Sequence, residues 1–191
     1  MKSIKGTKTE KNLLMTFAGE SQARMRYTFW ASVAKKEGYE QISAIFTETA
    51  DQEKEHAKRM FKFLEGGDVE ITASYPAGQI RSTLENLSEA AKGEEHEYME
   101  LYPACADVAD AEGFPEIAEM YRAVSVAEKF PAERYRALEK NIKEGHVFER
   151  TADKKWRCRN CCYVYEGKEA PEICPACLHP RAYYEIAAEN Y

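Results

Sequence analysis

The sequence predicts a mainly α-helical protein, in which a bundle of four long helices precedes a small cysteine-rich domain of short strands. Three observations support this fold class. Residues 7–142 are rich in Ala, Glu, Lys, Leu and Met, which favour helices. Apolar residues recur in this part of the chain at helical spacing. The last part of the chain instead contains two Cys-x-x-Cys pairs, a pattern typical of a metal-binding domain.

Turn signals divide the helical part into four segments. They lie near Gly38, across residues 65–78, near Gly113 and at residues 143–146, and they leave helices of roughly 25 to 35 residues. The second connection is the longest, so we expect it to cross the bundle. The expected domains are residues 1–146 and 147–191.

Composition and charge limit the classes of function. A chain of 191 residues, 44% of them apolar, can bury one core and carry a small appendage. Its net charge of −6 argues against broad binding to nucleic acids or anionic membranes, so small molecules or proteins are the expected partners. No apolar run is long enough for a signal peptide or a membrane span. We therefore expect a cytoplasmic protein, in which clustered cysteines indicate metal rather than disulfides.

The two predicted helix pairs repeat one another. The stretch EGYEQISAIF, which starts at residue 37, aligns with EGFPEIAEMY at a shift of 75 positions, and DQEKEHAKRM aligns with VAEKFPAERY at the same shift. Glu20 aligns with Glu94 at a shift of 74, whereas Tyr27 aligns with Tyr102 at 75, so one residue has been added early in the third helix. Each chemical group in the first half therefore predicts a partner in the second.

Every predicted helix carries a glutamate in phase with its apolar stripe: Glu20, Glu53, Glu94 and Glu128. His56 shares the stripe of Glu53. Ionised carboxylates are almost never buried without a partner, because isolated burial is very unfavourable. No stripe of Lys or Arg faces them, so a metal cation is expected between the helices. This layout is that of a di-metal carboxylate bundle, in which two helices each supply one Glu and the other two each supply a Glu-x-x-His motif.

Pro131 interrupts this layout. The repeat aligns Glu53-Lys-Glu-His56 with Glu128-Lys-Phe-Pro131, so a proline stands where a second imidazole is predicted. The proline side chain offers no donor atom, and inside a helix it also removes a backbone hydrogen bond. Two alternatives stay open: Glu128 could lie on the solvated face of a kinked helix, and Glu53 with His56 could form an ordinary surface pair.

Three further residues are candidates for the same centre. Glu97 lies one turn after Glu94 and could reach it, although a surface position is the alternative. Tyr27 and Tyr102 are matched by the repeat and could donate hydrogen bonds to the ligand carboxylates, or they could be core tyrosines. Oxygen ligands with one or two imidazoles suit iron or manganese better than a thiol-binding ion. A pair of redox metals can deliver the two electrons that cleavage of an O–O bond requires.

The cysteine-rich tail predicts a second kind of metal site. Cys158 and Cys161 form one Cys-x-x-Cys turn, and after a spacer of twelve residues Cys174 and Cys177 form another. Two such turns facing each other make a tetrahedral cage of four thiolates for Zn or Fe, and the spacing alone allows a structural zinc site. Cys162 directly follows the first pair, and we interpret it as a bystander thiol that could compete as a ligand.

Together these residues resemble the rubrerythrin family, in which a ferritin-like diiron four-helix bundle is followed by a rubredoxin-like domain. The likeness covers nearly the whole chain, and its motifs are Glu20, Glu53-x-x-His56, Glu94-x-x-Glu97, Glu128 and the four cysteines in their order. It implies a non-haem diiron peroxidase that reduces hydrogen peroxide to water in oxidative-stress protection. It also implies that the cysteines hold a mononuclear Fe, which receives electrons from rubredoxin or a reduced-nicotinamide:rubredoxin oxidoreductase, and that the chain forms a homodimer.

The resemblance further implies a ligand set for the first iron: Glu20, Glu53, Glu128 and either Glu97 or His56, which exchange on reduction. Glu97 or a bound water would relay protons. The residues expected to take part in the reaction are Glu97, His56, Tyr27 and Tyr102.

The second iron is the one that Pro131 affects. By the same resemblance it would use Glu94, the shared Glu53 and Glu128, and a histidine where Pro131 stands. Our hypothesis is that this iron binds more weakly through carboxylates and water, or that its site is often half-filled. Peroxidase activity should then be low, and the substitution Pro131→His should raise it.

Two rival functions come from other classes. One is a ferroxidase that oxidises and stores iron, which the bundle motif allows but for which an electron-transfer domain would be superfluous. The other is a metal-binding scaffold that has a structural zinc ribbon and a bundle site impaired at Pro131.

Overall fold

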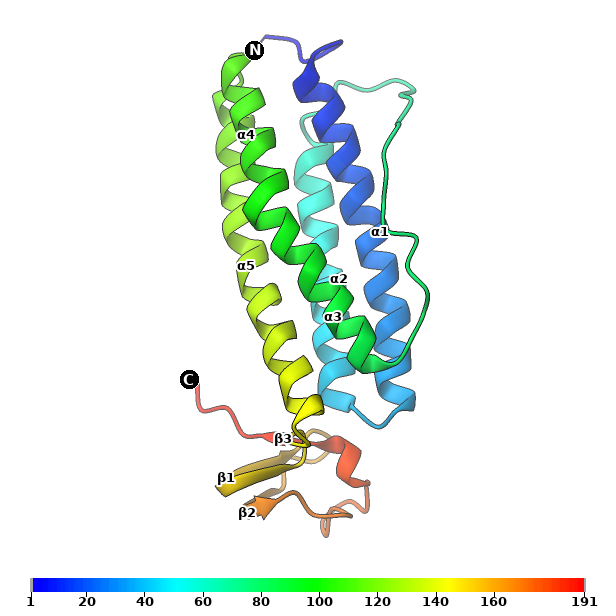
Figure 1. Cartoon of the computed structure of the whole chain (residues 1–191), viewed down its shortest axis with the longest axis vertical. Helices are drawn as coiled ribbons and strands as arrows, with labels where there is room; N and C mark the ends of the chain where they lie inside the picture. Colours follow the sequence, from blue (N-terminus) through cyan, green and yellow to red (C-terminus); the bar gives the residue numbers. More distant parts are fainter. Residues whose placement is uncertain (1, 191) are drawn as a thin grey trace.

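The first helix, α1 (Lys8–Lys36), begins where Thr7 caps it. The Thr7 hydroxyl accepts a hydrogen bond from the backbone N–H of Glu10 at 3.1 Å, which satisfies one of the donors that a helix leaves free at its start. In the computed structural model, which describes residues 2–190, α1 runs along the bundle and α2 (Glu40–Phe61) runs back beside it (Figure 1). With 22 residues, α2 is somewhat shorter than the sequence predicted.

Equivalent glycine turns join the two helices of each pair. Gly38 and Gly113, which the repeat aligns, have φ angles of +83° and +81°, a left-handed conformation that glycine adopts without a Cβ clash. The next residues, Tyr39 and Phe114, each donate a backbone hydrogen bond of 2.8 Å to an alanine carbonyl in the preceding helix. The repeat in the sequence is therefore also a repeat in local structure.

The longest connection, residues 62–82, returns the chain along the outside of α1 to the other end of the bundle (Figure 1). Tyr75 fixes part of it, because its hydroxyl donates to the carbonyl of Met15 at 3.3 Å. The next helix, α3 (Thr83–His96), starts at a capping box, in which the side chains of Ser82 and Glu85 each bind the other's backbone N–H.

The third long helix contains a π-helical turn. It consists of α3, η1 (Glu97–Leu101) and α4 (Tyr102–Ala111), which follow one another without a break. The backbone N–H of Tyr102 bonds to the carbonyl of Glu97, five residues back, whereas an α-helix uses four. Such a turn lets a helix take up one extra residue. The turn lies where the repeat shift changes from 74 to 75, so the added residue accounts for η1.

The last long helix, α5 (Pro115–Lys143), is continuous through its interior proline. Pro115 lies in the first turn, where no intrahelical N–H bond is lost. Pro131 is buried in the middle and cannot donate to the carbonyl of Ala127. Glu128 nevertheless faces the interior and is 0% exposed, so the alternative that placed it on a solvated face is wrong.

Two apolar clusters fill the bundle, one toward each end. The cluster near the start of α1 includes Leu13 and Ile117, and the other includes Ala34 and Ile42. Members of the two clusters correspond under the repeat: Tyr102 with Tyr27, Cys105 with Trp30, Tyr121 with Phe46, and Met60 with Tyr135. The internal two-fold thus extends to core packing, and the middle of the bundle is left to polar side chains.

The tail is a small antiparallel sheet below the bundle. Its strand order is β2-β1-β3, formed by β1 (Glu149–Cys158), β2 (Val164–Glu169) and β3 (Tyr184–Ile186), with a short helix η2 (Arg181–Tyr183) before β3. Trp156 is buried in its centre and donates from Nε1 to the carbonyl of Gly167 at 2.9 Å. The expected domain boundary after residue 146 falls between α5 and β1.

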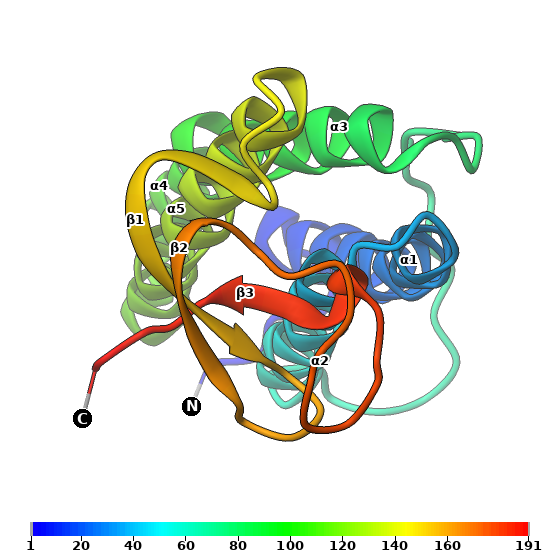
Figure 2. The same cartoon turned by 90° about the horizontal axis from the view of Figure 1, so that it is seen from below.

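The sheet contacts the bundle at the turn between α1 and α2. α2 touches both β3 and η2 there, as the view from below shows (Figure 2). The rings of Tyr39 and Phe148 stack with centroids 6.2 Å apart and planes 9° from parallel. The structure therefore confirms the predicted fold class, a four-helix bundle with a small domain of short strands.

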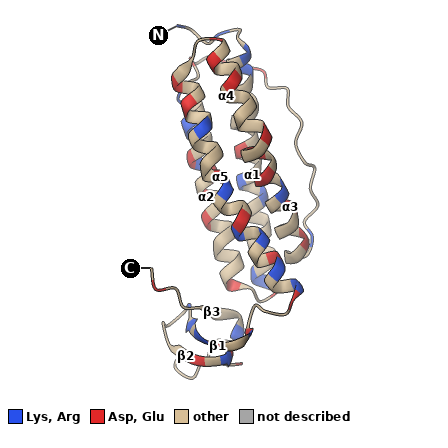
Figure 3. Cartoon of the chain, turned by 60° about the vertical axis from the view of Figure 1, so that its left-hand side comes forward, with Lys and Arg blue, Asp and Glu red and all other residues tan. Residues whose placement is uncertain are grey.

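Positions of Lys and Arg (blue) and of Asp and Glu (red) alternate along the helices of the bundle (Figure 3). Within residues 2–190, no helix combines the length and the apolar character that crossing a membrane would need.

Candidate metal centres

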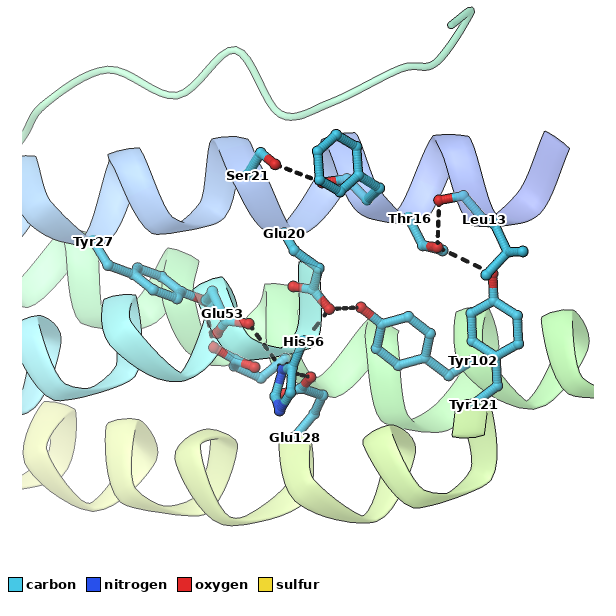
Figure 4. A network of polar contacts seen from close by, with 12 residues as sticks. Leu13, Thr16, Glu20, Ser21, Tyr27, Glu53, His56, Tyr102, Tyr121 and Glu128 are labelled. Carbon is cyan, nitrogen blue, oxygen red and sulfur yellow. Dashed lines mark hydrogen bonds and ion pairs between the residues drawn. The ribbon is translucent and has the colours of Figure 1, made fainter. Parts of the chain in front are cut away.

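Four glutamates and one histidine converge inside the bundle. Glu20 comes from α1, Glu53 and His56 from α2, Glu94 from α3 and Glu128 from α5. The four carboxylates are each 0% exposed. Figure 4 shows Glu20, Glu53, His56 and Glu128 turned toward one another between the helices. The structure thus brings together the side chains that helical phase and the repeat single out.

The first group of candidate ligands contains the imidazole. One ligand atom from each of Glu20, Glu53, His56 and Glu128 lies within 4.8 Å of the others. His56 Nδ1 lies 2.8 Å from Glu128 Oε1, 3.3 Å from Glu53 Oε2 and 3.9 Å from Glu20 Oε1. Because Glu53 is fully buried, the alternative of an ordinary surface pair is wrong for Glu53 and His56.

The second group contains only carboxylates. Ligand atoms of Glu94, Glu97 and Glu128 lie within 4.8 Å of one another, so Glu128 belongs to both groups, as a bridging ligand would. Glu97 is the first residue of η1 and is only partly buried. The resemblance implied that Glu97 exchanges with His56 at the first ion, whereas the structure groups it with Glu94. The charge of Glu20, a member of the first group, also contributes to raising the pKa of Glu97.

Burial makes this cluster of acids unfavourable without a cation. It raises the pKa of Glu20 and of Glu94 to about 7. Burial and then the charges of neighbouring glutamates raise three further pKa values well above the usual range, those of Glu53, Glu97 and Glu128. Burial also lowers the pKa of His56 to about 4, so the imidazole is neutral at pH 7 and can act as a metal ligand.

Several carboxylate oxygens of the cluster lack a hydrogen-bond partner within the described part of the chain: Glu20 Oε2, Glu53 Oε1, Glu94 Oε2 and Glu128 Oε2. A buried polar atom without a partner costs about 1–3 kcal/mol, more when it is charged, and native proteins rarely leave one. Cations between the helices would satisfy all four. Carboxylates with one neutral imidazole are ligands that iron and manganese accept, so the residues present fit a pair of such ions.

Two tyrosines hold the ligand carboxylates. The hydroxyl of Tyr27 donates to Glu94 Oε1, and that of Tyr102 donates to Glu20 Oε1. Figure 4 shows Tyr102 aimed at Glu20. Burial, followed by the charge of the bonded glutamate, raises the pKa of each phenol well above its usual range, so both stay protonated donors. Such contacts fix the orientation of a ligand.

Arg26, a charged residue that affects the cluster, was not identified from the sequence. Burial is the main cause of the raised pKa values of Glu94 and Glu97, and the positive charge of Arg26 partly offsets it. The repeat aligns Arg26 with Leu101, which is not charged. The repeat therefore did not identify Arg26 as a residue near the cluster.

The four cysteines of the tail form a compact group. The Sγ atoms of Cys158, Cys161, Cys174 and Cys177 lie within 4.8 Å of one another. The distances Cys158–Cys177 and Cys161–Cys174 are 3.7 and 3.6 Å, much longer than an S–S bond, and all four are free thiols. The backbone N–H of His179 is the main cause that lowers the pKa of Cys177 to about 6, which favours the thiolate that a metal binds.

Cys162 lies outside this group. It is exposed, with φ of +64°, and Leu178 has the equivalent place after the second pair, with φ of +61°. Both adopt a left-handed conformation that favours glycine. The four-sulfur group is complete without Cys162, in line with its interpretation as a bystander thiol.

A four-helix bundle that encloses shared carboxylate ligands, joined to a four-cysteine domain, defines a ferritin-like di-metal protein with its own electron-transfer module. The sequence profile named rubrerythrin matches residues 11–139, and that of the rubrerythrin rubredoxin-like domain matches residues 156–185. The chain belongs to the rubrerythrin family, a family of oxidoreductases. The carboxylate cluster is accordingly a diiron site and the four-cysteine group a rubredoxin-like iron site.

Known relatives match over nearly the whole chain. A rubrerythrin of Porphyromonas gingivalis is 62% identical over 100% of this chain and 95% of its own length. A rubrerythrin of Nitratidesulfovibrio vulgaris is 58% identical over 100% of both chains. A solved structure of nigerythrin in a mixed-valence state aligns with 97% of this chain and 92% of its own, with a TM-score of 0.64 and 29% identity. The resemblance seen in the sequence is confirmed.

Proposed function

We propose that this chain is a peroxidase that reduces hydrogen peroxide to water. The observation that carries the proposal is the pairing, in one chain, of a buried carboxylate cluster for two ions with a separate four-thiolate group. Iron in these groups supplies the redox chemistry, an electron pair for the O–O bond in the bundle and single-electron transfer at the cysteines. A storage protein would not need the second group.

The bundle residues divide into two ligand sets in this proposal. The first is Glu20, Glu53, His56 and Glu128, and the second is Glu94, Glu97 and the shared Glu128. Glu53 lies near enough to Glu94 for their charges to interact, which supports its role as a second bridge. Because the bundle buries four of the five carboxylates completely, it excludes bulk water from the reacting atoms.

Glu97 is the residue best placed to exchange protons with solvent. It is the one carboxyl of the five that is not fully buried. Its neighbours are anchored, Glu94 by Tyr27 and Glu20 by Tyr102, whereas no side chain in residues 2–190 donates a hydrogen bond to Glu97. We assign Glu97 the delivery of protons to the oxygen atoms of the substrate, and the two tyrosines the positioning of ligands.

The position of the tail favours a homodimer. The sheet touches the bundle near Tyr39, and Glu53 lies fourteen residues further along α2, or about 20 Å at ~1.5 Å per residue. That is a long path for an electron within one chain. Transfer from the tail of a second chain placed beside the cluster would be shorter, and we propose that arrangement.

The electron donor in this proposal is rubredoxin or a reduced-nicotinamide:rubredoxin oxidoreductase. Its acceptor is the four-cysteine group, of which Cys161 is exposed and thus accessible to a protein partner. The six cysteines are all unpaired, which fits a reducing compartment such as the cytoplasm.

Anaerobic iron loading followed by stopped-flow addition of hydrogen peroxide tests the proposal. We expect iron in the bundle and in the tail, and rapid reoxidation with one peroxide consumed per pair of bundle ions. Zinc in the tail with no reaction would instead support a scaffold, and growing iron cores on aerobic addition of Fe²⁺ would support storage. Glu53→Gln should abolish the reaction while the four-cysteine iron spectrum persists.

A further inference from the structure

The two halves of the metal cluster are chemically unequal. The repeat aligns His56 with Pro131, and each lies three residues after a buried glutamate, Glu53 or Glu128. Pro131 is itself buried in α5. The helix thus places a residue without a donor atom where its counterpart on α2 carries an imidazole. This inequality is a property of the polypeptide, whatever ion is bound.

The ligand groups reflect the same difference. The first group places the nitrogen of His56 2.8 Å from Glu128 Oε1 and contains three carboxylates. The second group, formed by Glu94, Glu97 and Glu128, offers oxygen atoms alone. Glu94 Oε2 and Glu128 Oε2 are buried and lack hydrogen-bond partners among residues 2–190, so a cation bound by this group would satisfy both oxygens.

The π-helical turn brings a further carboxylate to the oxygen-only group. Glu97 begins η1, and the extra residue of that turn changes the phase of the helix directly after Glu94. The structure groups its carboxylate with Glu94 and Glu128, the group that the repeat associates with Pro131. All three ligands of this group are therefore carboxylates.

We propose that the two positions select different metals, and that the oxygen-only position accepts Mn²⁺ alongside Fe²⁺ while the His56 position retains Fe²⁺. Imidazole is a good ligand for iron, whereas carboxylate and water are good ligands for manganese. A position without the nitrogen ligand should therefore have a smaller preference for Fe²⁺ over Mn²⁺. The inference rests on the two-ion site of the proposed function. It adds that this chain forms a mixed manganese–iron centre when both ions are present.

Competitive loading tests the inference. The intact metal-free chain is equilibrated anaerobically with equal concentrations of Fe²⁺ and Mn²⁺, crystallised, and each position is assigned from anomalous scattering at the iron and manganese edges. We expect the Mn:Fe ratio at the Glu94–Glu97–Glu128 position to exceed that at the His56 position by about tenfold or more, the size of effect that changes around a metal site commonly have. Equal ratios at the two positions would overturn the inference.

Two variants isolate the nitrogen donor from the helix effect of proline. Pro131→His adds an imidazole and should lower the Mn:Fe ratio at the oxygen-only position toward that of the His56 position. Pro131→Ala removes the proline without adding a ligand and should leave the ratio as in the parent chain. If both variants change the ratio equally, helix geometry and not ligand type controls it, and the inference fails.

The same crystals separate this inference from the proposed function. Two filled positions with equal metal ratios would refute the manganese preference and leave the two-ion site intact. Absence of any ion from both positions would refute the two-ion site, and the inference with it.

Discussion

Within the described part of the chain, the fully buried glutamates of the metal cluster have no Lys or Arg side chain as a hydrogen-bond partner. Glu20 and Glu94 keep one oxygen on a tyrosine hydroxyl, while the other has no partner in residues 2–190. The two tyrosines fall at matching places of the repeat, which is why the sequence could single them out. Their contribution is to hold a carboxylate in one orientation before an ion arrives.

Removing either tyrosine hydroxyl should weaken metal binding by the glutamate that it contacts. We expect Tyr27→Phe and Tyr102→Phe each to lower metal affinity by about 10–100-fold, because the freed carboxylate oxygen loses its only donor. Titration of the metal-free protein with Fe²⁺ measures the effect. Tyr121→Phe is the matched control, since the Tyr121 hydroxyl contacts Thr16 at 3.1 Å and no cluster residue. An equal loss in the control would mean that core packing, not the hydrogen bond, is responsible.

Among the helices, α5 differs most from what its sequence would favour. A proline in a helix interior costs ~3 kcal/mol or more, yet α5 is continuous through Pro131. Packing of its buried face compensates for the lost hydrogen bond. That the helix stays continuous could not be read from the sequence, because propensity argued for a kink and only tertiary contacts decide otherwise. The inward position of Glu128, in contrast, was predicted from its phase with the apolar stripe.

The local cost of Pro131 can be measured directly. We expect Pro131→Ala to raise the free energy of unfolding of the metal-free protein by up to about 3 kcal/mol, since it restores the N–H bond to the carbonyl of Ala127. Denaturant titration gives the value. Pro115→Ala is the control and should change the free energy little, because a proline in the first turn breaks no intrahelical bond. Similar changes in both variants would contradict this account.

The π-helical turn shows the limit of prediction at this level. The change of repeat shift between Glu94 and Tyr102 reveals that one residue was added. An added residue can form a loop, a kink or a π-helical turn, and the sequence does not discriminate among them. The choice decides where Glu97 points, so its grouping with Glu94 became visible only in the structure.

For the molecule as a whole, most of the architecture was predictable. Helical periodicity, the glycine turns and the Cys-x-x-Cys spacing specify the two parts of the chain, and the repeat specifies which acids meet. The effect of Arg26 on the pKa of Glu94 was not predictable. The repeat aligns Arg26 with Leu101, and Arg26 belongs to no metal-binding motif. The placement of the tail against the turn near Tyr39 depends on long-range packing that no local pattern encodes.

The stability of the metal-free protein should fall as pH rises. The pKa values of Glu20 and Glu94 rise from the usual 4.5 to about 7 on folding, so the folded state binds these protons more tightly. Their stabilising contribution is complete below pH 4.5 and is lost as pH increases through 7. The lowered pKa of His56, from 6.5 to about 4, acts in the opposite direction below pH 6.5, but it is one group against several carboxyls.

Denaturant titrations of the metal-free protein from pH 5 to pH 8 test this expectation. We expect a decrease on the order of a few kcal/mol in the free energy of unfolding over this range. The double substitution Glu20→Gln and Glu94→Gln should make the profile flatter, because the amides do not titrate. A profile that rises with pH in the parent metal-free chain would contradict the raised pKa values.

The extended segment of residues 62–82 has a topological consequence. It is the sole covalent link between the α1–α2 hairpin and the helices that follow, and it runs outside the core (Figure 1). The first ligand group spans this connection, with Glu20, Glu53 and His56 on the α1–α2 hairpin and Glu128 on α5. If a protease cut this segment, an ion bound by the first ligand group would crosslink the two resulting polypeptides. Removal of that ion with a chelator would then weaken their association, because no peptide bond would join them.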